Sequence, residues 1–399
     1  MISQNTSLDA WLGCDYTYSM LKELSVGFNV RTLIDPKIRG FNRCIIELIR
    51  ALRRIAPENK IHLFSDRLLA DSHLASLGGC FVHASKLKPH LLWEQLALPY
   101  ECSLHALDIF HAPINVGIPR WLPSSTRRVV TLHDMFGFQS VRRANKLDRS
   151  AVSFWISWNC IKAADAIITV SEYSKRQILA EYPAWQNKVF VIHNGIHSGF
   201  SPGSPDPNVV QKYQLQAPYV LYVGGFELRK NVAVLAQAFA ALKPSVCRDH
   251  CLAMVGDGSN VPQSVVQAFS GLSDVHWLGF VSDAELISLY KGATCVVVPS
   301  LGEGFGLPLL EAMACGCPVL SSNAGSLPEI GGQAVAYFEP YDATHLTSLL
   351  ERLIREPQWA RSLRSAGIEQ ARNFSWENTA KHTLALYHQI AGNRAINSI

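Results

Sequence analysis

The sequence predicts an α/β protein with two doubly wound, Rossmann-like domains, and three observations support this fold class. The chain has 399 residues, which is enough for two domains that each bury a core. Short apolar segments alternate with amphipathic segments, as strands and helices do in parallel sheets covered on both faces. This alternation stops at residues 201–207, where three prolines and a glycine occur in seven residues, and then starts again.

The first half of the chain contains one strong helix and a series of short apolar strands. Over residues 41–55, apolar side chains recur at helical spacing at Cys44, Ile45, Leu48, Ile49 and Leu52. The expected strands are short and bounded by turn residues; they cover residues 26–30, 61–64, 109–112, 129–132, 166–170 and 189–192.

The second half repeats the alternation of strand and helix. Strands are expected at 219–223, 251–255, 275–278, 294–298, 318–321 and 334–338, and helices near 231–242, 283–291, 308–315, 344–355 and 359–372. We therefore expect one domain over residues 1–208, a second over 209–375, and a closing helical segment over 376–399. In open α/β sheets, ligands bind at the carboxyl ends of the strands.

The composition is that of a globular protein, with 48% hydrophobic and 17% charged residues. No apolar run of about 20 residues predicts a membrane span, and residues 1–12 lack the features of a secretory signal. The ten scattered cysteines are then expected to be reduced thiols, as in a cytoplasmic protein. No nucleic-acid partner is expected. Residues 1–25 are expected to be a poorly placed extension.

Positive charge is concentrated in the first half. Residues 1–210 hold 23 Lys and Arg against 17 Asp and Glu, a balance of +6, whereas residues 211–399 hold 13 against 15, a balance of −2. The basic half favours either an anionic membrane surface or simply a solvated basic face. The helix over 41–55 leaves the same two alternatives: Arg43, Arg50, Arg53 and Arg54 accompany its apolar stripe.

The densest motif runs from Pro299 to Pro318, where an apolar strand leads into a glycine-rich loop and then a helix. Pro308 suits the first turn of that helix and Gly316 suits its end. Amides at a helix N-terminus form an anion site that suits a diphosphate, and here they belong to Gly304, Phe305, Gly306 and Leu307.

Two glutamates bracket this motif. Glu303 is expected in the loop, where a carboxylate can accept hydrogen bonds from sugar hydroxyls, and Glu311 in the first turn of the helix, where it can hold ribose hydroxyls. The alternative for Glu311 is a favourable interaction with the positive end of the helix dipole.

A second motif, residues 222–231, follows the first strand of the second domain. Gly224 and Gly225 permit a tight turn, Arg229 and Lys230 supply adjacent cations, and Asn231 is expected to cap the next helix. Cations and amides aimed at a departing diphosphate would lower the barrier to transfer of the attached group. Because no Asp-x-Asp metal motif stands out, we predict no obligatory metal.

These motifs together resemble the family-4 retaining glycosyltransferases of the GT-B fold, in which two Rossmann-like domains face a central cleft. The resemblance covers almost the whole chain. It includes Glu303 with Glu311, Arg229 with Lys230, and the segments 255–258, 171–174 and 193–196.

The resemblance implies a role for each of these residues. Glu303 would contact the donor sugar near the reacting carbon, Glu311 the nucleotide ribose, and Arg229 and Lys230 the diphosphate. His133 would reach the sugar from the opposite wall. The segment 374–377 and the helix after it resemble the helix of the family that crosses back to the first domain.

The sequence departs from the family pattern at two places. The loop over 38–43, which is expected near the donor phosphates and the acceptor, keeps Gly40 but carries Asn42 at a usual glycine position, so the family pattern does not fix the placement of the acceptor. His197 stands where the family usually has Asp.

The resulting hypothesis is transfer of a hexose, with retention, from a nucleoside-diphosphate sugar to a glycan or lipid-linked glycan. Mannose from GDP-mannose is the first expectation, since residues 92–96 and the overall pattern resemble bacterial surface-polysaccharide mannosyltransferases; a UDP-glucose-type donor is the alternative. A nicotinamide oxidoreductase is disfavoured, because no Gly-x-Gly-x-x-Gly follows the first strand. A non-catalytic carbohydrate-binding relative would not need the intact Glu303, Glu311, Arg229 and Lys230.

Overall fold

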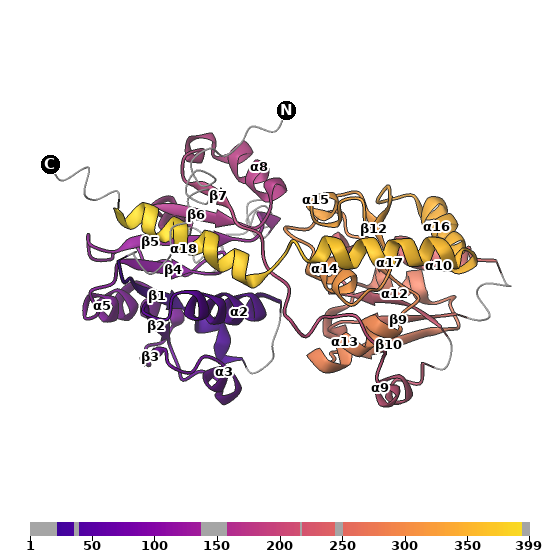
Figure 1. The fold of residues 1–399 in the computed structure, drawn as a ribbon, viewed down its shortest axis with the longest axis horizontal. Helices are drawn as coiled ribbons and strands as arrows, with labels where there is room; N and C mark the ends of the chain where they lie inside the picture. Colours follow the sequence, from indigo (N-terminus) through magenta and orange to yellow (C-terminus); the bar gives the residue numbers. More distant parts are fainter. Residues whose placement is uncertain (1–21, 36–39, 137–157, 216–217, 244–249, 393–399) are drawn as a thin grey trace. The chain divides into compact units, whose positions relative to one another are not determined.

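A computed structural model describes residues 22–35, 40–136, 158–215, 218–243 and 250–392. The chain forms two compact units (Figure 1). The first unit comprises residues 1–195 together with 375–399, and the second comprises residues 196–374. At the ends of the second unit, the Ile196 amide donates a hydrogen bond of 2.9 Å to the Phe374 carbonyl, so these two ends lie side by side.

The first unit is built on a seven-stranded, fully parallel sheet. Its spatial order is β3 (Phe81–Ala84), β2 (Lys60–Ser65), β1 (Ser25–Asn29), β4 (Ile109–Ala112), β5 (Arg127–Leu132), β6 (Ala166–Thr169) and β7 (Val189–Val191). The strand order reverses between β1 and β4, which is where open α/β sheets bind ligands.

The helices of the first unit cover this sheet. Helix α2 (Gly40–Ile55) buries its apolar stripe and packs against α18 (Trp376–Gly392), although the two are far apart in sequence. The remaining helices are η2 (Arg31–Ile34), α3 (Asp71–Ser76), α4 (His90–Leu92), the π-helical η3 (Trp93–Ala97), α5 (Leu98–Ser103), α8 (Glu172–Glu181) and η4 (Pro183–Trp185).

The second unit repeats the architecture with six parallel strands. Their order is β10 (Val275–Gly279), β9 (Cys251–Val255), β8 (Tyr219–Val223), β11 (Cys295–Val298), β12 (Val319–Ser322) and β13 (Ala336–Phe338), so the reversal lies between β8 and β11. Its core joins Val220, Leu252 and Val297 of the strands to helix side chains such as Leu235 and Leu350.

Ten helical segments accompany these strands in the described residues of the second unit. They are α9 (Pro207–Lys212), η5 (Leu228–Lys230), α10 (Val232–Ala240), η6 (Gly258–Asn260), α12 (Gln263–Phe269), α13 (Asp283–Gly292), α14 (Leu307–Ala314), α15 (Leu327–Gly331), α16 (Ala343–Arg355) and α17 (Pro357–Ala371).

The fold class expected from the sequence is confirmed, and each expected strand occurs to within a few residues. Strand β3 is the one strand of the first sheet that the sequence analysis does not expect, because its four residues form no long apolar run. It is an edge strand, and its side chains Phe81 and Val82 are exposed.

The apolar face of α2 is buried inside the first unit. This burial favours the interpretation that α2 is a helix packed on its sheet, with its arginines in solvent. Within the described residues, none of the helices has both the length and the hydropathy needed to cross a bilayer. The expected extension lies outside the described residues up to position 21, as do Ile38 and Arg39 of the first loop.

Candidate functional site

Two loops of the second unit meet at its strand-order reversal. One follows β8 and carries Arg229 and Lys230 in the short helix η5; the other follows β11 and carries Glu303. The Leu301 amide donates a hydrogen bond of 2.8 Å to the Arg229 carbonyl, which fixes one loop against the other. The sequence motifs on separate loops therefore form one cluster.

The Glu303 carboxylate is the centre of this cluster. It accepts hydrogen bonds from Lys230 Nζ at 2.8 Å, from an Arg229 guanidinium nitrogen at 3.2 Å and from Ser300 Oγ at 2.6 Å. The same Arg229 nitrogen donates to the Gly302 carbonyl at 2.6 Å. Because each cation contacts a loop carbonyl or carboxylate at short range, the charges are held in fixed positions.

The electrostatics of Glu303 are set by burial and by these two cations. Burial raises the pKa of its carboxyl, and the charges of Lys230 and Arg229 outweigh that effect, so the pKa lies below its usual value. The carboxylate is therefore ionised at neutral pH and available as a hydrogen-bond acceptor.

Two glycines give the Glu303 loop its shape. Gly306 precedes helix α14 with a φ of 101°, a conformation that other residues rarely adopt. Gly325, with a φ of 69°, lies so close to the loop that a Cβ there would be 2.6 Å from the Glu303 amide nitrogen. Beside it, Ser326 donates from its backbone amide and its hydroxyl to the Glu303 carbonyl, at 3.2 and 3.0 Å.

The remaining residues of the expected anion loop divide into backbone and core roles. Leu307 is the first residue of α14, with Pro308 in its first turn, so the amides at this end have no partner within the helix. Gly304 and Phe305 are buried, and the Phe305 ring packs edge-on against Phe374 at a centroid distance of 5.9 Å.

Gly225 also lies at this edge of the sheet, directly after β8. Its carbonyl accepts a hydrogen bond from the Tyr222 hydroxyl, which anchors the turn to the buried strand.

The expectation that Asn231 caps helix α10 is wrong. Asn231 has a left-handed backbone (φ 51°, ψ 35°) and makes no capping hydrogen bond. Instead its side-chain amide donates to the carbonyls of Pro299 at 3.1 Å and Pro340 at 2.6 Å. Asn231 therefore joins the loops that follow three different strands, β8, β11 and β13.

The expectation that Glu311 lies in the first turn of its helix is also wrong. Helix α14 begins at Leu307, so Glu311 is its fifth residue and cannot neutralise the amides at its start. The side chain is only 4% exposed and accepts a hydrogen bond of 3.0 Å from the buried Tyr290 hydroxyl. Burying a carboxylate costs free energy unless the group is paired or hydrogen-bonded. A glutamate at this position is therefore not explained by helix formation alone.

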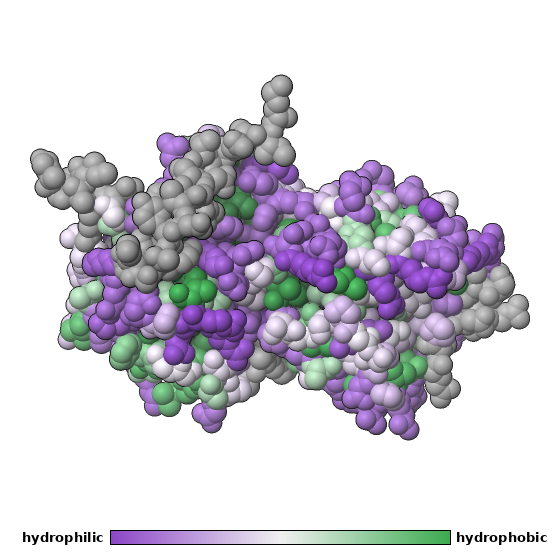
Figure 2. Space-filling view, in the orientation of Figure 1, coloured by the Kyte–Doolittle hydropathy of each residue, from purple (hydrophilic) through white to green (hydrophobic). Residues whose placement is uncertain are grey.

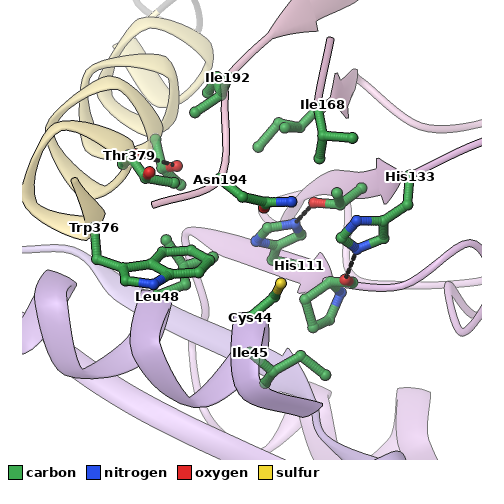
Figure 3. Close-up of a pocket in the computed structure, with 14 residues that line it drawn as sticks. Cys44, Ile45, Leu48, His111, His133, Ile168, Ile192, Asn194, Trp376 and Thr379 are labelled. Carbon is green, nitrogen blue, oxygen red and sulfur yellow. Dashed lines mark hydrogen bonds between the residues drawn. The ribbon is translucent and has the colours of Figure 1, made fainter. Parts of the chain in front are cut away.

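His133 lies at the carboxyl end of β5 in the first unit. Its backbone amide donates to Asn115 Oδ1 at 2.8 Å, and its Nε2 lies 3.1 Å from the Pro113 carbonyl (Figure 3). A carbonyl can only accept, so Nε2 carries the proton and Nδ1 is an acceptor. Burial lowers the pKa of His133, which keeps this imidazole neutral.

His111, which the sequence analysis did not single out, lies next to His133 in the pocket of Figure 3. It is fully buried, and its ring nitrogens lie 2.6 Å from the Tyr387 hydroxyl and 2.8 Å from Thr131 Oγ1. Burial lowers its pKa to about 3. A single histidine in an apolar strand gives no sequence signal, because its partner Tyr387 is 276 positions away.

Gly40 and Asn42 lie at the start of helix α2, beside a second pocket of the first unit lined by Thr32, Asn42, Asn115 and His133. The buried Asn42 side chain donates to the Thr32 carbonyl at 3.3 Å. The departure from the family pattern therefore ties the start of α2 back to the segment that follows β1.

Comparisons with known proteins agree with this architecture. Residues 38–199 match the family model described as Glycosyltransferase Family 4, and residues 208–374 match the model described as Glycosyl transferases group 1. The chain is 34% identical over 287 residues to O-antigen chain mannosyltransferase B of Escherichia coli, covering 70% of this chain and 74% of that protein. It is 30% identical over 229 residues to the serotype-specific mannosyltransferase WbdA of E. coli, of whose length this match spans 28%.

Solved structures share the fold. Sucrose-phosphate synthase from Thermosynechococcus elongatus superposes with a TM-score of 0.72 at 22% identity, covering 93% of this chain and all of that one. Anabaena HepE in complex with UDP-glucose gives 0.69 at 18% identity, covering 94% of this chain and all of that one. The two Rossmann-like units, the two family matches and the 34% identical relative from E. coli agree: the chain belongs to the family-4 glycosyltransferases of the GT-B fold.

Proposed function

We propose that this glycosyltransferase moves mannose from GDP-mannose to a glycan or lipid-linked glycan, with retention of configuration at the anomeric carbon. The observation that carries the proposal is the cluster of Glu303, Lys230 and Arg229 at the strand-order reversal of the second unit. It joins two cations to one ionised acceptor, which suits a ligand with both phosphates and sugar hydroxyls.

In this proposal Lys230 and Arg229 stabilise the diphosphate as it leaves. The bond between the anomeric carbon and the phosphate oxygen breaks, and the acceptor oxygen bonds to the same face of that carbon. The proton of the acceptor hydroxyl passes to the leaving phosphate oxygen. Negative charge grows on the diphosphate during this step, so cations held in place beforehand lower the barrier.

The other polar groups bind and orient the donor. Glu303 accepts hydrogen bonds from sugar hydroxyls, Glu311 holds the ribose, and the amides of Gly304, Phe305, Gly306 and Leu307 face the diphosphate. Gly225 and Gly40 let the backbone approach the phosphates. His133 offers its unprotonated Nδ1 to a hydroxyl of the sugar.

Mannose is favoured by the relatives rather than by the geometry. Two E. coli relatives at 34% and 30% identity are named mannosyltransferases, and so is the MMP alpha-(1->4)-mannosyltransferase of Mycolicibacterium hassiacum at 33%. The structural neighbour HepE binds UDP-glucose, at 18% identity. UDP-glucose is therefore the competing donor in the test.

The test is a calorimetric titration of the full chain with GDP-mannose, UDP-glucose, UDP-N-acetylglucosamine and NADH, followed by NMR of the product anomer. Tight binding of GDP-mannose and an α-linked product support the proposal, because the donor carries the α configuration. Preferential binding of UDP-glucose would overturn the assignment of mannose as the donor sugar, and the same mechanism would then apply to glucose transfer from UDP-glucose. A β-linked product overturns retention, and binding of NADH alone overturns the function.

We further propose that the first unit contacts an anionic membrane through the helical segment α4, η3 and α5. Exposed apolar side chains recur there at every fourth position. Trp121 is also exposed, and it lies near this segment, because the amide of its neighbour Arg120 donates a hydrogen bond of 2.8 Å to the side chain of Gln95 in η3. Figure 2 shows apolar residues gathering on the surface of this unit. The surface consists of Leu92, Leu96, Tyr100, Leu104 and Trp121, with the exposed cations Lys86, Lys88 and Arg120 nearby.

Co-sedimentation with vesicles that contain phosphatidylglycerol tests this contact. The variant Leu96→Glu is expected to lose most of the binding, whereas Val266→Glu, at an exposed apolar position of the second unit, keeps it. Equal binding by both variants would contradict the assignment of this surface.

A further inference from the structure

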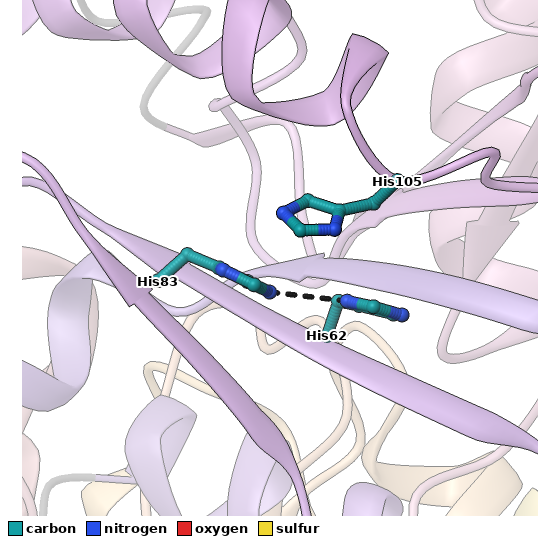
Figure 4. A group of neighbouring side chains, drawn as sticks. All are labelled: His62, His83 and His105. Carbon is teal, nitrogen blue, oxygen red and sulfur yellow. Dashed lines mark hydrogen bonds between the residues drawn. The ribbon is translucent and has the colours of Figure 1, made fainter.

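Three histidines gather at the β3 edge of the first unit, whereas Glu303, Lys230 and Arg229 belong to the second (Figure 4). His62 belongs to β2, His83 to the edge strand β3, and His105 to the turn between α5 and β4. Three steps across the sheet separate β2 from β5, after which His133 lies. This group has no part in the proposed transfer reaction.

The parallel register explains why the two strand histidines meet. His62 pairs with Phe81 and Phe64 pairs with His83, so all four side chains project from one face of the sheet. His105 packs on that same face, with ring-centroid distances of 4.2 Å to His83 and 5.1 Å to His62. Residues from three separate segments of the chain thus converge on one point.

The ring nitrogens are close enough to share an ion. His62 Nδ1 lies 3.0 Å from His83 Nε2, and one nitrogen of each histidine lies within 4.8 Å of those of the other two. With metal–nitrogen bonds of about 2.0–2.1 Å, a tetrahedral ion holds its ligands about 3.3 Å apart. The His62–His83 nitrogen distance is close to this value, and the limit of 4.8 Å places the His105 nitrogen within reach of the same ion by a change in its side-chain torsion angles.

Burial and solvent access both suit a bound ion. His62 is 7% exposed, whereas His83 and His105 are half-buried, so the group is closed on the sheet side and reachable from solvent. The His105 ring packs against the rings of His62, Phe64 and His83.

We propose that His62, His83 and His105 form a site for one divalent transition-metal ion of the Zn²⁺ class, with water as the fourth ligand. A set of imidazole nitrogens selects Zn²⁺, Ni²⁺, Co²⁺ or Cu²⁺ over Mg²⁺ and Ca²⁺, which prefer oxygen ligands. The ion ties the edge strand β3 to β2 and to the turn after α5. It stabilises the first unit and leaves the transfer chemistry of the second unit unchanged.

Metal titration of the full chain tests the site. The protein carries no histidine tag and is first dialysed against EDTA; Zn²⁺, Ni²⁺ and Mg²⁺ are then followed by calorimetry and thermal unfolding. We expect one Zn²⁺ or Ni²⁺ per chain, a rise in unfolding temperature that EDTA reverses, and no effect of Mg²⁺.

Variants locate the bound ion. Loss of even an outer-shell partner lowers metal affinity by about 10- to 100-fold, so His105→Gln and His83→Gln are each expected to weaken binding at least tenfold. His105 lies in a turn, so its variant keeps the metal-free unfolding temperature. The control His345→Gln, an exposed histidine of α16, binds the ion as the original chain does. Unchanged affinity in both site variants, or no binding of either ion by the original chain, would overturn the proposal.

Discussion

The two units share one topology but differ in the chemistry at the carboxyl ends of their strands. Beside the strand-order reversal of the second unit, the polar groups are charged and paired, with Lys230 and Arg229 on Glu303. At the corresponding edge of the first unit lie two neutral imidazoles, His133 with Asn115 and His111 with its hydroxyl partners, and Asp134 directly follows His133. The same topology thus supports a cluster of ion pairs in one unit and a pair of neutral imidazoles in the other.

Under the proposed function, this difference becomes a division of labour between the units. The positive charge of the second unit, fixed by loops that Asn231 and the close approach of Gly325 hold together, would bind the diphosphate. The neutral imidazoles of the first unit would bind sugar hydroxyls. Each half of the comparison makes its own measurable prediction.

The largest expected effect comes from removing charge from the second unit. Lys230→Ala is expected to lower kcat/KM by on the order of 100- to 1000-fold, about 2.7–4 kcal/mol, because charge on the leaving diphosphate loses a fixed partner. Steady-state kinetics with the preferred donor measures this loss. Lys243→Ala is the matched control, since that lysine is 61% exposed and pairs with Glu351 away from the cluster. A value for Lys230→Ala within about threefold of the original chain would contradict the role of the cluster.

A smaller effect is expected from disturbing the backbone that shapes the cluster. Gly325→Ala places a methyl group 2.6 Å from the Glu303 amide at a φ of 69°. The strain is expected to cost about 1–3 kcal/mol of unfolding free energy in the second unit. Urea unfolding of this variant is compared with Gly271→Ala, where a Cβ meets no atom within 4 Å. Equal stability of the two variants would mean that the loop relaxes without strain.

The last prediction distinguishes the units by pH. Burial is the main cause of the lowered pKa of the histidines that follow, all in the first unit and outside the proposed metal site: His90, His111, His133 and His388. Their stabilising effect is present above about pH 6.5, the pKa in the unfolded chain, and is lost as the pH falls toward the folded values, which is about 3 for His111. Each imidazole that protonates only on unfolding lowers the stability by about 1.4 kcal/mol per pH unit.

Hydrogen exchange at pH 7 and pH 5, corrected for the intrinsic rates, measures this difference. Peptides of β4 and β5 are expected to lose protection at pH 5, whereas those of β8 and β11 keep it. Equal loss in both units would show that general acid unfolding, and not the buried imidazoles, sets the pH dependence.

The sequence predicted the elements well because their signals are local. Apolar runs bounded by turn residues identify buried parallel strands such as β8 and β11. The motif residues Arg229, Lys230 and Glu303 lie in the loops after these two strands, so they could be located from the strands. The exposed edge strand β3 has no such run, so the histidine group that depends on it could not be foreseen.

The errors at the site concern the exact geometry of helix starts. Asn231 suits a cap by residue type, but its left-handed backbone turns the side chain toward Pro299 and Pro340. Glu311 was assigned to a first turn because the helix was expected to start at 308, one residue late. Neither the pairing of Glu303 with two cations nor that of His111 with Tyr387 is local, so both needed the folded chain.

The order of the units along the chain has a consequence for biosynthesis. The second unit is one continuous stretch, residues 196–374, whereas the first is completed by α18, which supplies Tyr387 to His111 and packs on α2. During translation the whole second unit therefore leaves the ribosome before the first can close its core.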